Sequence, residues 1–185
     1  MATAQVNPML HPLDDFYSQA SRPLPDVKLL SESGVPQPYR ALLVHERDMT
    51  PTLEEHYQSQ VRLKVLSRQK RGGFYYREVL LFSSANPNEA QPIEFGAIKI
   101  NLNSLPLPAQ KEVVSELMPF GNVLAKYKVI HSSKPKGYFS VRADEFISAL
   151  LGCPIAAELY GRRNTLFSEE MRPIAEIVEI LPPAL

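Results

Sequence analysis

The stretch YYREVLLF, Tyr75 to Phe82, decides the fold class, because it predicts a strand that is buried on both faces. Side chains alternate between the two faces of a strand, so Arg77 lies on one face and Glu78 on the other, each among apolar neighbours. Arginine and glutamate are rarely buried unless something pairs with them. Both side chains therefore need partners that this stretch does not supply.

Strand and turn patterns on both sides extend this strand into a sheet. QVRLKVLSRQ alternates apolar and polar residues, KRGGFY predicts a hairpin turn, and an apolar strand follows in IEFGAIKINL. A second hairpin is expected in KVIHSSKPKGYFSVR, and PIAEIVEILPP predicts a last strand. The stretches PLPAQKEVVSELM and ADEFISALLG predict helices. The pattern indicates an α+β fold with a largely antiparallel sheet and helices packed on one face.

The length of 185 residues favours one domain. Prolines recur in residues 1–39, which predicts short helices only, so we expect a proline-rich segment that packs on a core formed by residues 40–185. A helix-turn-helix motif does not fit this segment.

The charge balance and the single cysteine restrict the class of protein. Twenty basic and twenty acidic residues leave no basic excess for nucleic acid binding, and no stretch is apolar over the length of a membrane span. Cys153 lies in an apolar run and is predicted to be a buried filler, which fits a cytoplasmic location. We expect a monomer, since no apolar helix stripe requires a partner.

Motifs for phosphate, dinucleotide or metal binding are missing from the sequence. GxGxxG, the P-loop, GxSxG and HExxH do not occur, and the four histidines lack ligand spacing. Composition and pattern alone therefore indicate only a cytoplasmic α+β domain with an arginine and a glutamate in apolar strands.

The last predicted strand carries one glutamate on each of its otherwise apolar faces, Glu176 and Glu179. An apolar environment raises the pKa of a glutamate and suits it to general acid catalysis. The alternative is structural, with either glutamate paired to Arg62, Lys64 or Arg77 across the sheet.

Five short motifs, in their order, resemble the chorismate pyruvate-lyase family over residues 42–183. They are ERDMTPTLE, YYREVLL, PFGNVL, YGRRNTL and AEIVEILPP. The resemblance implies an antiparallel sheet of about six strands and release of pyruvate from chorismate, leaving 4-hydroxybenzoate for ubiquinone-type or plastoquinone-type quinones. It also implies that the reaction needs no metal or organic cofactor.

The resemblance assigns roles to five residues. Arg77 matches the arginine that binds the ring carboxylate, and a guanidinium fits a carboxylate with two parallel hydrogen bonds. Met49 and Phe120, the latter with Gly121 after it, match positions that face the ligand through their backbone. Glu179 matches the glutamate at the oxygen-bearing ring carbon, where it is expected to donate a proton.

Several positions depart from the family pattern. Glu179 matches the family's glutamate only if the alignment is shifted by one residue. Such a shift reverses the face to which the side chain points, so Glu176 is the alternative. Ala97 stands where an arginine is expected, and Lys99 is a candidate to replace its charge. The extra segment around 143–152 is either a lid or a packed helix, with packing favoured. Arg162 and Arg163 either attract the dicarboxylate substrate or bond loop carbonyls, and the structural role is favoured.

A second function remains open. The same general fold occurs in effector-binding domains of bacterial transcription regulators, so the chain could be a non-catalytic protein that binds a small aromatic acid. Retention of Arg77 without a correctly placed Glu179 would favour this alternative, and a related lyase acting on another enolpyruvyl acid is a third.

Overall fold

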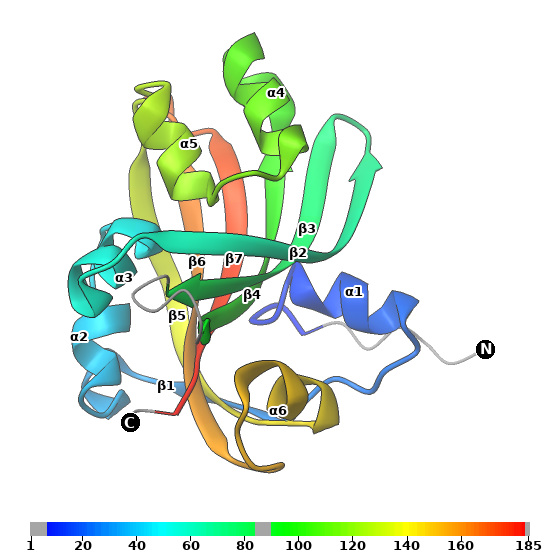
Figure 1. Ribbon diagram of the computed structural model, residues 1–185, viewed down its shortest axis with the longest axis vertical. Helices are drawn as coiled ribbons and strands as arrows, with labels where there is room; N and C mark the ends of the chain where they lie inside the picture. The colour runs from blue at the N-terminus through cyan, green and yellow to red at the C-terminus, as the bar shows by residue number, and fades with distance from the viewer. Residues whose placement is uncertain (1–6, 84–89, 184–185) are drawn as a thin grey trace.

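The computed structural model describes residues 7–83 and 90–183, which form a seven-stranded sheet surrounded by short helices (Figure 1). The strand order is β1-β5-β6-β7-β4-β3-β2, and every neighbouring pair is antiparallel. The strands are β1 (Val27–Leu30), β2 (Val61–Arg71), β3 (Phe74–Ser83), β4 (Gln91–Asn101), β5 (Ser132–Arg142), β6 (Glu158–Phe167) and β7 (Pro173–Leu181). The predicted α+β class with an antiparallel sheet is confirmed.

Six α-helices are present in the described part of the chain. They are α1 (Leu13–Gln19), α2 (Tyr39–Leu43), α3 (Met49–Tyr57), α4 (Leu107–Ser115), α5 (Phe120–Lys126) and α6 (Glu145–Leu151), with short 3₁₀ turns at Glu32–Gly34 and Leu102–Ser104. None of these helices has the length and apolar character that a transmembrane helix needs.

Two details of the sheet differ from the sequence prediction. The proline-rich segment contributes strand β1, which pairs with β5 at one edge of the sheet. The hairpin expected over 128–142 is wrong, because β5 is one continuous strand whose register against β6 shifts between Pro135 and Gly137. A proline is tolerated in a strand at such an irregularity, so it does not mark a turn here.

Helices cover both faces of the sheet, whereas the sequence predicted helices on one face only. We name the faces after two residues of β3. The Arg77 face packs against α4 and α5 through residues such as Tyr75, Ile98 and Phe120. The Glu78 face packs against α1 and α6, which bury Leu13, Phe16, Ile147 and Leu151. A strand as apolar as β3 has two faces to cover, and the N-terminal segment and the extra segment cover the second one.

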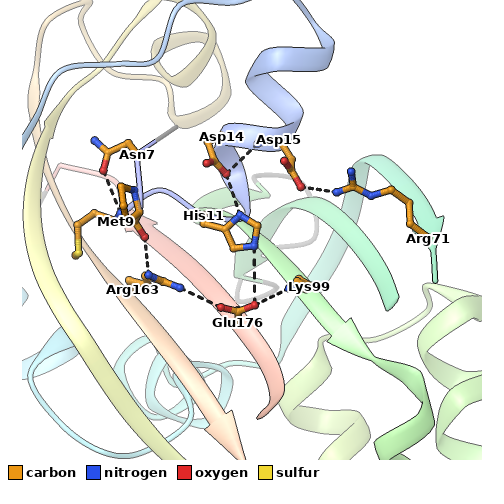
Figure 2. Close-up of polar contacts among 10 residues, drawn as sticks. Asn7, Met9, His11, Asp14, Asp15, Arg71, Lys99, Arg163 and Glu176 are labelled. Atoms are coloured by element: carbon orange, nitrogen blue, oxygen red, sulfur yellow. Dashed lines mark hydrogen bonds and ion pairs between the residues drawn. The ribbon is translucent and has the colours of Figure 1, made fainter. Parts of the chain in front are cut away.

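A cluster of charged residues attaches the N-terminal segment to the Glu78 face (Figure 2). The Glu176 carboxylate lies 2.8 Å from Lys99 Nζ, 3.0 Å from an Arg163 guanidinium nitrogen and 3.9 Å from His11 Nε2. Arg163 also donates to the carbonyl of Pro8 at 2.6 Å. Glu176 therefore has a structural role on this face.

Candidate ligand-binding site

A cavity of about 60 Å³ lies on the Arg77 face, between the sheet and the first residues of α3 and α5. One water molecule needs about 10–15 Å³ by this measure, so the cavity has room only for a small molecule. All five residues that the sequence assigned to a site line it: Met49, Arg77, Phe120, Gly121 and Glu179.

The sheet register explains how residues distant in sequence meet here. Two rows of directly paired residues cross β3, β4, β7 and β6: Arg77, Ile98, Ile177 and Asn164 form one, and Val79, Gly96, Glu179 and Arg162 form the next. Gly96 in the second row carries no side chain, and a methyl group there would lie 2.2 Å from the carbonyl oxygen of Val178. Glycine is therefore required where β4 approaches β7.

Arg77 is 1% exposed and has unpaired donors. Its Nε and Nη1 atoms have no hydrogen-bond partner among residues 7–83 and 90–183. Burial lowers the pKa of Arg77 to about 10, while Tyr75 and Glu116 act in the opposite direction, so the guanidinium is charged at neutral pH. A buried cation with free donors in a cavity needs an anionic partner.

Glu179 lies on the same face and is held by Arg162. The Nε of Arg162 donates to the Glu179 carboxylate, and both side chains are buried. The terminal nitrogens of Arg162 donate to the carbonyls of Leu43, His45 and Arg47 at 3.1, 3.0 and 3.2 Å. Arg162 therefore orients Glu179 and anchors the loop before α3. Its bonds to loop carbonyls were predicted from the sequence, whereas its pairing with Glu179 was not.

The structure places Glu179, and not Glu176, at the cavity. Glu176 belongs to the charged cluster on the Glu78 face, and the cations paired with the two glutamates are not the expected Arg62, Lys64 or Arg77. The suggestion that Lys99 supplies a charge in place of Ala97 is wrong, because Lys99 binds Glu176 on the far side of the sheet. The extra segment is a packed helix, α6, on that same far side.

The starts of α3 and α5 form the roof of the cavity. Met49 is the first residue of α3 and Phe120 the first residue of α5, so their N–H groups have no acceptor within the helix. The helices meet where Gly121 faces Thr50, and a methyl group on Gly121 would lie 2.9 Å from the Thr50 hydroxyl oxygen. Close contact of the two helices depends on this glycine.

Besides Thr50, sequence reasoning missed three polar residues that line the cavity: Asp48, Glu94 and Asn164. Each has one buried side-chain oxygen without a hydrogen-bond partner in the described residues. The other oxygen of Asp48 lies 2.8 Å from His131 Nε2, and this hydrogen bond raises the pKa of His131. Glu94 had a detectable signal, since it interrupts an apolar strand in the same manner as Arg77.

Comparisons with known proteins identify the fold but no family. Models of known protein families do not match the sequence, and curated proteins yield no related chain. The solved structures of PhnF from Mycobacterium smegmatis and of its effector domain are similar, with TM-scores of 0.57 and 0.55 and 8% identity in both cases. The matches cover 75% and 73% of this chain, 65% of the PhnF chain and 88% of the effector domain.

A regulator from Escherichia coli CFT073 is also similar, at a TM-score of 0.51 and 12% identity, over 66% of this chain and 96% of that protein. At these identities the likeness concerns the fold alone. The chain therefore shares the chorismate lyase-like fold, which effector domains of transcription regulators also adopt.

Proposed function

We propose that the cavity binds a small aromatic carboxylic acid and that the protein is a chorismate pyruvate-lyase. The observation that carries the proposal is the buried Arg77, which lines the cavity and has donors without partners in the described residues. The ligand carboxylate would bind this guanidinium with two charge-assisted hydrogen bonds, and the free N–H groups of Met49 and Phe120 would face the ligand from the roof.

The proposed reaction uses the carboxyl groups of the cavity. In chorismate, the bond from the ring to the enolpyruvyl oxygen breaks, a proton leaves the neighbouring ring carbon, and the enolpyruvyl group gains a proton to become pyruvate. The product ring is aromatic, so the protein needs mainly to position the substrate and to move protons. No group beyond these side chains is required, and the buried Cys153 fits a cytoplasmic location.

A second candidate function is binding without turnover. It is favoured by the fold shared with the effector domain of PhnF. In that case Arg77 would still anchor a carboxylate, but 4-hydroxybenzoate would be a ligand and not a product.

The first experiment incubates the purified protein with chorismate and measures 4-hydroxybenzoate and pyruvate together. We expect equimolar products from the unchanged protein, at least a 100-fold lower kcat/KM for Arg77→Met, and little change for Arg163→Gln, a control on the Glu78 face. Arg77→Met loses two charge-assisted hydrogen bonds of about 1.5–3 kcal/mol each, which corresponds to at least the 100-fold loss in kcat/KM. Saturable binding of 4-hydroxybenzoate without products would exclude the lyase and leave the binding protein.

A further inference from the structure

Glu94 lines the cavity, and neither the sequence nor the proposed function has given it a role. It is 4% exposed, and its Oε2 has no hydrogen-bond partner in residues 7–83 and 90–183. Glu94 lies on β4 two residues from Gly96, which pairs directly with Glu179. Along β4, Glu94 lies four residues and the partner of Glu179 two residues from Ile98, the residue opposite Arg77, so both carboxyl groups lie on the same side of Arg77.

The two carboxyl groups have different partners. Glu179 forms an ion pair with Arg162, whose Nε donates a hydrogen bond to its carboxylate. Within the described part of the chain, no cation is bonded to Glu94. Burial and then the charge of Glu179 raise the pKa of Glu94 well above its usual value, and Arg162 opposes this only in part. The raised pKa favours the protonated form of Glu94, which can donate a hydrogen bond, whereas the Glu179 carboxylate can accept one.

We propose that Glu94 and Glu179 form a donor–acceptor pair for a hydroxyl group on the ligand, at the end opposite the carboxylate held by Arg77. The Glu94 O–H donates to the hydroxyl oxygen, and the hydroxyl donates to Glu179. The inference rests on the proposed function and narrows it to ring acids with a hydroxyl group remote from the carboxylate. It also changes the sequence-based role of Glu179 from proton donor to acceptor.

The proton balance of the lyase reaction follows from this pair. Glu179 takes the proton that leaves the ring carbon, and Glu94 gives its proton to the departing enolpyruvyl group as the carbon–oxygen bond breaks. Transfer of one proton from Glu179 to Glu94 then restores both groups. No proton is gained or lost by the protein over one turnover.

Calorimetric binding of 4-hydroxybenzoate and of benzoate, which lacks the hydroxyl group, tests the pair. We expect the unchanged protein to prefer 4-hydroxybenzoate by at least 10-fold. Glu94→Gln retains a hydrogen-bond donor and should keep most of this preference, whereas Glu94→Leu should reduce it to below 3-fold with benzoate binding retained. In the turnover assay, Glu94→Gln should lower kcat at least 100-fold because an amide cannot release its proton.

The outcomes separate this inference from the proposed function. An unchanged preference in Glu94→Leu, or an unchanged kcat in Glu94→Gln, would overturn the role of Glu94 while leaving Arg77 as a carboxylate site. Failure of the unchanged protein to bind either acid would overturn the proposed function itself. Circular dichroism of both variants establishes that they fold, and the near-isosteric Glu94→Gln keeps the test valid if Glu94→Leu does not.

Discussion

Single buried charges distinguish the two faces of this sheet. On the Glu78 face, Glu176 pairs with the cations Lys99 and Arg163 and lies 3.9 Å from His11 Nε2, which satisfies it within the protein. On the Arg77 face, Arg77 has two donor atoms without partners. A buried charge that the protein leaves unsatisfied lowers stability, so its retention points to a ligand.

Replacement of Arg77 should separate stability from binding. We expect Arg77→Met to raise the free energy of unfolding by about 1–3 kcal/mol, because it removes the cost of burying unpaired donors. Ligand binding should be lost in the same variant. Urea unfolding without ligand measures the first effect, and the exposed Arg62→Met is the control, with a change within about 0.5 kcal/mol. A clear loss of stability in Arg77→Met would mean that Arg77 is satisfied by the protein.

At the scale of elements, the cavity depends on the contact between α3 and α5. Neither helix reaches ten residues, and each begins at the cavity, so small shifts of either helix change the position of its first N–H group. Asp48, which precedes α3, is also bonded to His131 before β5. The roof is therefore fixed at the helix starts.

Enlarging Gly121 should displace this roof. In Gly121→Ala the new methyl group would lie 2.9 Å from the Thr50 hydroxyl oxygen, so the helices must move apart. We expect a loss of about 1–3 kcal/mol in unfolding free energy and at least a 10-fold weaker binding of 4-hydroxybenzoate. Adding Thr50→Ala removes the hydroxyl oxygen nearest to the new methyl group. The double variant should regain part of the unfolding free energy and part of the affinity. Unchanged affinity in Gly121→Ala would show that the roof does not position the ligand.

For the whole molecule, the sheet separates the Arg77 face, which holds the cavity, from the Glu78 face, which also holds a buried acid. Glu78 is 3% exposed. It lies near Tyr17 of α1, Asp144 at the start of α6, and Arg22. Burial raises the pKa of Glu78 to about 7, against the opposing charge of Arg22 and with the help of Asp144.

The raised pKa of Glu78 predicts the pH dependence of stability. The folded state holds this proton more tightly than the unfolded state, so its contribution is present at low pH and is lost as the pH rises through about 7. The shift corresponds to about 3 kcal/mol at most. Urea unfolding at about pH 5 and at about pH 8 gives the loss of unfolding free energy over this pH interval. This loss should be smaller in Glu78→Gln than in the unchanged protein, and the exposed Glu158→Gln should show the same loss as the unchanged protein. Equal losses in all three would refute a titrating Glu78.

The amino-acid sequence by itself determined strands β3, β4 and β7 and the burial of Arg77. Periodicity over YYREVLLF, IEFGAIKINL and PIAEIVEILPP indicates β3, β4 and β7, because alternation of side chains is a local property of a strand. The same local patterns identified Arg77, Glu176 and Glu179 as unusual charges. They did not identify β1, whose four residues are too short for a clear pattern.

Only the tertiary structure decided which charges meet. The partners of Arg162, Glu176 and Glu179 depend on the order and register of β4, β6 and β7, and a shift of one residue exchanges the two faces. Glu94 joined the cavity for the same reason, since its neighbour Glu179 is 85 positions away in sequence (179 − 94). Local periodicity indicates that successive side chains lie on opposite faces of a strand. Which side chains are neighbours is decided by pairing of strands that are far apart in the sequence.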